Sequence, residues 1–200
     1  HAGEVGLAPQ IAALRGARIV QDSFVAGLTF VIAVFFVVLV AYRGFEATAL
    51  VFACICLGMC IYQMNSGHHV GVLIHPWLPY RLLFHLRFVI LGSLPGLYML
   101  LFASLYPREC HVVARYAVVG ASAAYAICGV VLPMRLLTAS LATFHVFATA
   151  ALGYLLYVLI RAWASRREDA AVFVAGLALF IVATVNDTLM VELNLRSVYL

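Results

Sequence analysis

Four polar side chains inside apolar stretches are the strongest candidates for chemistry in this 200-residue chain: Arg87, His145, Asn186 and Asp187. Charged groups within a membrane are costly, and they usually face other helices or water. With the N-terminus outside, all four fall near the outer ends of predicted membrane spans. We therefore predict one polar signalling cluster that includes an Arg87–Asp187 ion pair. The alternative is that each side chain reaches the membrane surface on its own.

A second pattern is a stripe of soft side chains at every fourth position: Cys56, Cys60, Met64 and His68. Thiolate, thioether and imidazole groups suit Cu(I). A single helix does not supply converging ligands, however, so we interpret the stripe as packing and predict no metal site and no cofactor. The sequence also lacks nucleotide-binding motifs and any combination of residues typical of catalysis. This stretch is therefore predicted not to be an enzyme.

The composition indicates that lipid surrounds most of the chain. Hydrophobic residues make up 66% of the chain and charged residues 10%, with a mean hydropathy of +1.09. A soluble domain is about half apolar and a quarter charged. The net charge of +4 is small and scattered, which argues against nucleic-acid binding. All 12 basic residues are arginines, a bias that we take to indicate a bacterial source.

The hydropathy pattern predicts an all-α, polytopic bundle of membrane-spanning helices. A span needs about 20 mostly apolar residues. Six stretches qualify: Ser23–Tyr42, Ala47–Asn65, Leu82–Tyr106, Val112–Leu132, Leu136–Ile160 and Ala170–Val191. Within the third of them, Gly92 and Gly96 have the spacing of a close helix contact, and Pro95 predicts a kink.

We divide the chain into an extracytoplasmic lead-in, residues 1–22, and a transmembrane domain, residues 23–200. The missing initiator Met and the end just after a polar turn lead us to expect an internal piece of a longer protein, truncated before its last helix. Without the lead-in, one set of loops carries six arginines and the other set four. The positive-inside rule then favours an N-terminus outside the inner membrane of a bacterium.

Three passages resemble a known family. They are Phe24-Val25-Ala26-Gly27 in the first span, the stretch from Phe102 to Pro107 at the end of the third, and Val185-Asn186-Asp187-Thr188-Leu189-Met190 late in the sixth. The last is similar to the Asn-Asp-x-Leu stretch of the bacterial seven-transmembrane receptors with diverse intracellular signalling modules. Asn186 and Asp187 match that motif. Six of the seven spans would be present here.

The resemblance implies a sensor and transducer module. It implies an extracytoplasmic ligand-binding domain and a cytoplasmic effector in the same polypeptide, from two-component or cyclic-nucleotide signalling. A second copy of the chain is a further candidate partner. The alternative function is a small-solute transporter or channel, which predicts a polar stripe or broken helices at the membrane midplane. Here the polar residues gather near one end, which favours the receptor.

Overall fold

The computed structural model describes residues 4–43, 46–65, 79–167 and 170–179. This part of the chain is helical apart from short turns, and it contains no strand. The labelled helices are α1 (Glu4–Arg43), α2 (Ala47–Asn65), α4 (Tyr80–Leu105), α5 (Val112–Val131), α6 (Met134–Ala139) and α7 (Leu141–Ala164). A further apolar helix, Ala170–Leu179, follows α7. The predicted all-α class is confirmed.

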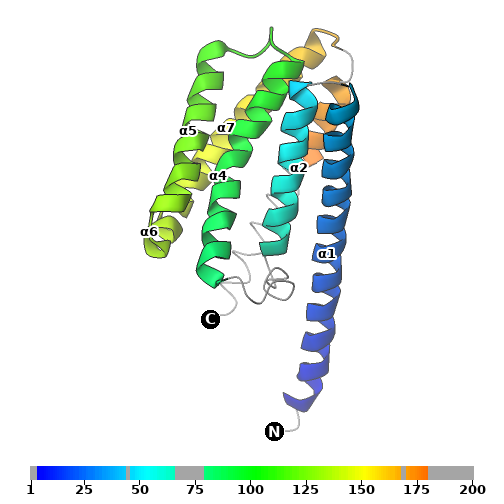
Figure 1. Ribbon diagram of the computed structural model, residues 1–200, viewed down its shortest axis with the longest axis vertical. Helices are drawn as coiled ribbons and strands as arrows, with labels where there is room; N and C mark the ends of the chain where they lie inside the picture. The colour runs from blue at the N-terminus through cyan, green and yellow to red at the C-terminus, as the bar shows by residue number, and fades with distance from the viewer. Residues whose placement is uncertain (1–3, 44–45, 66–78, 168–169, 180–200) are drawn as a thin grey trace.

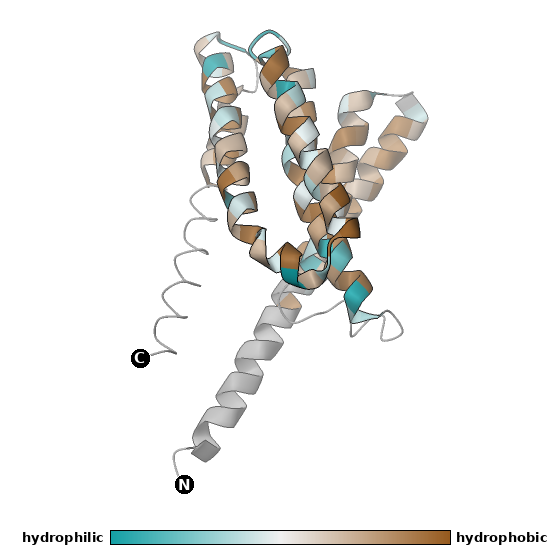
Figure 2. Cartoon of the chain, turned by 90° about the vertical axis from the view of Figure 1, so that its left-hand side faces the viewer, coloured by the Kyte–Doolittle hydropathy of each residue, from teal (hydrophilic) through white to brown (hydrophobic). Residues whose placement is uncertain are grey.

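Five helices are long and apolar enough to cross a membrane, and they coincide with the first five predicted spans to within a few residues. The sixth predicted span is described as far as Leu179. The long span-forming helices expose much apolar surface: in α1, for example, Phe24 is 70% exposed and Phe35 60% exposed. Figure 2 shows that the most hydrophilic residues lie at helix ends and turns. Such a surface is stable when lipid covers it.

Two element boundaries differ from the predicted ones. The lead-in is not a separate segment in its secondary structure, because α1 runs without a break from Glu4 through the first span. The fifth span begins at Leu141, not at Leu136, because a short helix, α6, precedes it. The Ser140 hydroxyl donates to the Leu137 carbonyl at 2.9 Å. A continuous helix would offer that carbonyl to the backbone N–H of Leu141, so the serine competes with the helix ladder.

The helices α1, α2, α4 and α5 pack side by side in chain order, and α7 packs on α4 (Figure 1). The α4–α5 turn lies at the same end of the bundle as the end of α7, and the N-terminus of α1 lies at the opposite end. A buried cluster joins α4, α7 and the start of the last described helix: Met99, Phe102, Tyr106, Leu155, Val158, Leu159, Ala162 and Ala170. This cluster positions the end of the bundle described next.

Candidate functional site

The predicted polar cluster is described only in part. Arg87 lies on α4 with its guanidinium carbon 5.4 Å from the centre of the Tyr62 ring on α2, a cation–π contact. Such contacts partly replace the water that a charge loses within an apolar bundle. The ring of His145 lies 6.2 Å from that of Phe144, and its side chain is exposed. No hydrogen bond joins Arg87 to His145 in the described part of the chain.

Asn186 and Asp187 lie outside the described residues, and so does His68 of the soft stripe. The Arg87–Asp187 ion pair therefore stays a prediction. Cys56 and Cys60, also from that stripe, are buried on α2. Among the described residues, no three His, Cys, Asp or Glu side chains are placed to hold a metal ion.

The contact between α4 and α5 is made by backbone. A Cβ atom on Gly92 would lie 2.9 Å from the Ala126 backbone nitrogen, and one on Gly96 would lie 2.8 Å from the Ser122 Cβ. Such distances leave no room for a side chain, so both glycines are needed for this approach. The predicted close contact of small residues is confirmed. On the α5 side, a Cβ atom on Gly129 would lie 3.0 Å from the Val89 backbone nitrogen on α4.

One interhelical hydrogen bond reinforces this contact. Nδ1 of His85 on α4 lies 2.8 Å from the Gly129 carbonyl on α5, so this nitrogen carries the proton in that bond. Nearby, the Ser122 hydroxyl is 2% exposed and has no hydrogen-bond partner in the described part of the chain. In the described part of the chain, close backbone packing and the His85 hydrogen bond thus hold this interface together.

A buried ion pair lies at the end of the bundle where α4 turns into α5. Nε of Arg167 donates to Oε1 of Glu109 at 3.1 Å, and the two residues are 58 positions apart. The Glu109 side chain is 7% exposed, whereas that of Arg167 is 41% exposed. The second carboxylate oxygen, Oε2, has no hydrogen-bond partner among the described residues. A buried carboxylate held by one donor depends strongly on that donor.

The turn after α7 aims Arg167 at Glu109. The Arg166 N–H bonds to the Trp163 carbonyl at 2.8 Å, and the Arg167 N–H bonds to the Ala162 carbonyl at 3.1 Å. This pair of bonds is a Schellman motif. Its left-handed position is usually glycine, but here Arg166 occupies it with a φ of 53°. A non-glycine residue in this conformation costs about 1–2 kcal/mol.

A hydroxyl on α7 contacts the same turn. The His111 backbone N–H donates to the Tyr154 hydroxyl at 2.9 Å.

Burial raises the pKa of the Cys110 thiol, and the Tyr154 hydroxyl and the Arg115 charge offset this rise only in part. The thiol is therefore mostly protonated near neutral pH. We call the five residues Tyr106, Glu109, Tyr154, Arg167 and Phe173 the Glu109 cluster.

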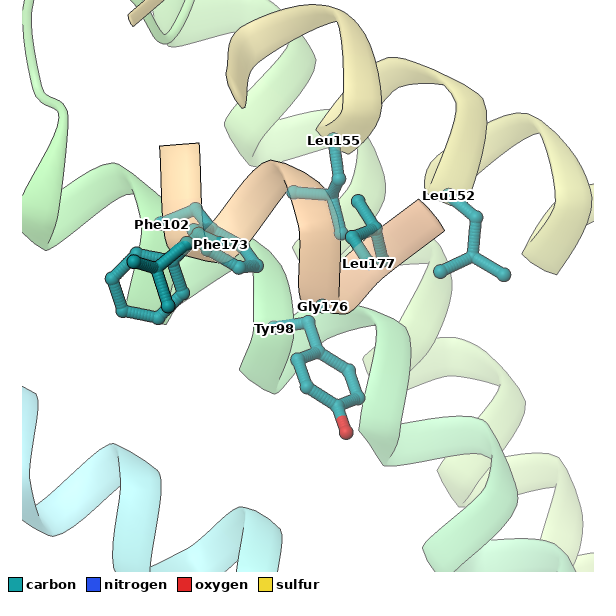
Figure 3. A pocket seen from close by; sticks show the side chains of 8 residues that line it. Tyr98, Phe102, Leu152, Leu155, Phe173, Gly176 and Leu177 are labelled. Atoms are coloured by element: carbon teal, nitrogen blue, oxygen red, sulfur yellow. The ribbon is translucent and has the colours of Figure 1, made fainter. Parts of the chain in front are cut away.

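Within this cluster Phe173 packs edge to face against Tyr106, and it makes the same kind of contact with Phe102 of α4. The Phe173 ring lies 5.7 Å from the Phe102 ring at 90° and 6.4 Å from the Tyr106 ring at 82°. Beside these rings is a partly open, apolar cleft of about 360 Å³. Figure 3 shows side chains from α4, α7 and Ala170–Leu179 facing one another around it. The last described helix thus rests on aromatic edges beside this cleft.

The arrangement links segments that are distant in the sequence. Its charged groups are paired across two turns, and its aromatic rings link three helices. The sequence reasoning missed Glu109 and Tyr154. Glu109 stands in a short turn between Arg108 and Cys110, where a charge is usually solvated, and its partner is far along the chain. In the sequence, Glu109 follows closely after the Phe102–Pro107 passage, but this position does not indicate that its side chain is buried.

The chain was compared with protein families, curated proteins and solved structures. The family model described as 7TM diverse intracellular signalling matches residues 20–199. No curated protein matches the chain, and no solved structure does.

Proposed function

The chain belongs to the 7TM diverse intracellular signalling family, the membrane module of signalling receptors, and from this premise we propose that it passes an extracytoplasmic signal to a cytoplasmic effector. In this proposal, a ligand-binding domain outside the membrane and an effector inside belong to the same polypeptide. The effector is a two-component or cyclic-nucleotide enzyme, and the membrane module itself catalyses nothing. The protein sits in a bacterial inner membrane with its N-terminus outside.

The observation that carries the proposal is the position of the Glu109 cluster. It joins the α4–α5 turn to the turn that precedes Ala170–Leu179. Ion pairs and packed rings that link two turns have discrete arrangements, which signal transfer requires. The helix Ala170–Leu179 begins just after the turn that contains Arg167, so it is a suitable element to pass a movement across the membrane.

The distribution of buried polar groups supports a receptor over a transporter. Three polar or charged side chains are buried among the described residues: Asn65, Glu109 and Ser122. Asn65 and Glu109 lie at opposite ends of the bundle's helices, and the Asn65 amide donates to the Ile61 carbonyl of its own helix. Transport needs polar groups or broken helices around a midplane site. The single serine hydroxyl on α5 does not make such a site.

The arginine distribution supports the proposed orientation. Arg108, Arg161, Arg166 and Arg167 all lie at or near the end of the bundle that holds the α4–α5 turn, as the path of the helices in Figure 1 shows. With Arg43 and Arg115 they make six loop arginines on this side, against four on the other when the lead-in is set aside, and loops with more arginine remain in the cytoplasm. The Glu109 cluster would therefore face the effector.

The test is a pair of reporter fusions in the full-length protein. A cytoplasm-active reporter and a periplasm-active reporter are each fused after Arg167 and, as the matched control, after Asn65. We expect cytoplasmic activity at Arg167 and periplasmic activity at Asn65. The reverse result would refute the orientation. Solute flux through liposomes that contain the purified protein, without any effect of the membrane module on effector output, would refute the receptor function in favour of transport.

A further inference from the structure

We propose that the Glu109–Arg167 ion pair is a latch that holds the helix Ala170–Leu179 on α4 and α7, and that opening the latch releases this helix to change effector output. The inference rests on the proposed function, because it assigns one of the receptor's two states to the closed ion pair. It adds the residues that hold that state.

The latch joins two turns that are distant in sequence. Glu109 belongs to the turn between α4 and α5, and Arg167 to the turn after α7. Arg167 is followed closely by Ala170, which is fully buried, and the backbone N–H of Ala170 lies 3.4 Å from the Arg167 carbonyl. A displacement of Arg167 therefore moves the start of the last described helix.

The ion pair combines a buried carboxylate, which depends on its partner, with a single hydrogen bond to a partly exposed arginine. Glu109 is 93% buried, and removal of its partner would leave an unpaired charge in an apolar environment. The pair nevertheless consists of one hydrogen bond, and Arg167 has solvent access at 41% exposure. An arginine that leaves the carboxylate can therefore hydrate quickly, while the carboxylate is left without its donor. The pair therefore has two discrete states: a closed state with Arg167 bound to Glu109, and an open state with Arg167 in water.

The turn stores strain at the same point. Arg166 has a φ of 53°, which side chains other than glycine adopt at a cost. The Schellman bonds of this turn orient Arg167 toward Glu109. If the ion pair opens, the turn no longer has a contact that favours the strained conformation. The backbone strain therefore favours release.

The helix Ala170–Leu179 borders a cleft among the described residues of α4 and α7. Its residues Phe173, Gly176 and Leu177 line the cleft of about 360 Å³ against α4 and α7. The rings of Phe102 and Tyr106 contact Phe173 by their edges. These contacts are made by side chains alone, whereas the contact of α4 with α5 brings the helix backbones together.

The test is a double-mutant cycle in membranes that contain the full-length receptor. The variants are Glu109→Gln, Arg167→Gln and the two together. Glutamine keeps the size of Glu109 and removes its charge. At position 167, where the side chain is 41% exposed, glutamine removes the guanidinium, so each variant breaks the ion pair. Cys110 is a native reporter, because its half-buried thiol adjoins Glu109. Its alkylation by N-ethylmaleimide is followed by peptide mass spectrometry, and effector output is measured in the same membranes.

We expect each single variant to alkylate Cys110 about tenfold faster than the parent, because a broken buried pair exposes its surroundings. The double variant should be no faster than either single variant, since both remove the same contact. All three should shift basal effector output in the same direction. Arg108→Gln is the matched control, because Arg108 adjoins Glu109 in the chain but has no ion pair among the described residues, and it should behave as the parent.

Three outcomes would overturn the latch. Unchanged alkylation in the single variants would show that the pair holds nothing, and additive effects in the double variant would show that the residues act separately. Equal acceleration at buried Cys56 would mean that the whole bundle loosens. An opened Cys110 with unchanged output would remove the signalling role of the latch and leave the proposed function intact. By contrast, reversed reporter fusions refute the proposed orientation, and solute flux without any effect on effector output refutes the receptor function, whatever Cys110 does.

Discussion

On the side of α4 that faces α5, glycines bring two backbones together, whereas on the side that faces α7 and Ala170–Leu179, large side chains meet around a cleft. The first contact depends on Gly92 and Gly96, where a Cβ atom would collide with α5. The second depends on rings, aliphatic side chains and the ion pair of Glu109 with Arg167. Backbone contact fixes one geometry, and side-chain contact next to open space allows several. The glycine contact is therefore the rigid side of α4, and the cleft side is the one to which the latch proposal assigns movement.

The largest expected effect is on the glycine side. Gly92→Ala should destabilise the protein by about 3 kcal/mol, because the new methyl group meets the Ala126 backbone nitrogen and neither helix can shift without the other. Thermal unfolding in detergent, followed by size-exclusion chromatography, measures the change. Gly120→Ala on α5 is the control, since its Cβ would meet nothing within 4 Å. A small effect at Gly92, similar to that at Gly120, would mean that the α4–α5 contact is not rigid.

The next effect is in the side-chain cluster. Leu159 on α7 is fully buried, and Leu159→Ala should cost about 2 kcal/mol. Lipid is as apolar as the protein interior, so this cost comes from lost packing and not from transfer out of water. Ile160→Ala is the control, because Ile160 is 47% exposed and faces the membrane. Equal unfolding temperatures for the two variants would contradict the assignment of a packed core to this side.

A smaller effect of opposite sign sharpens the comparison. Gly176→Ala should stabilise the protein by roughly 0.5–1 kcal/mol, because Gly176 borders the cleft with nothing within 4 Å of a Cβ, and alanine favours the helix. The same substitution thus has opposite signs at Gly92 and Gly176. The measurement is again the unfolding temperature. Destabilisation at Gly176 would show that the cleft is occupied by another group in the membrane.

The smallest effect concerns the chemistry of Cys110. Burial raises its pKa above the usual value of 9.0, so the reactive thiolate is scarcer at any pH below that value than for a thiol in an unfolded chain. The alkylation rate should therefore continue to rise as the pH is increased past 9.0. Guanidinium-unfolded protein is the control, and its rate should level off at lower pH. Coincident profiles would mean that Cys110 is not shielded.

Hydropathy and residue size alone predicted much of the fold. The five described spans follow from apolar runs of sufficient length, because the thickness of the membrane sets that length in the local sequence. Gly92 and Gly96 were recognised as contact residues for a similar reason: their spacing places them on one face of a helix. The break at Ser140 was missed, since it depends on whether one hydroxyl bonds to a carbonyl of its own turn.

The site was less predictable, for a physical reason. Arg87 was recognised as a costly charge within a span, but its partner in the structure is the ring of Tyr62, which no local pattern indicates. Glu109 and Arg167 each look like solvated turn residues in the sequence. Their pairing requires α4 and α7 to end at the same level and the Arg166 turn to adopt a left-handed conformation. Local sequence thus determined which segments enter the lipid, whereas the buried pair was decided by the tertiary structure, because only folding brings distant charges to one place.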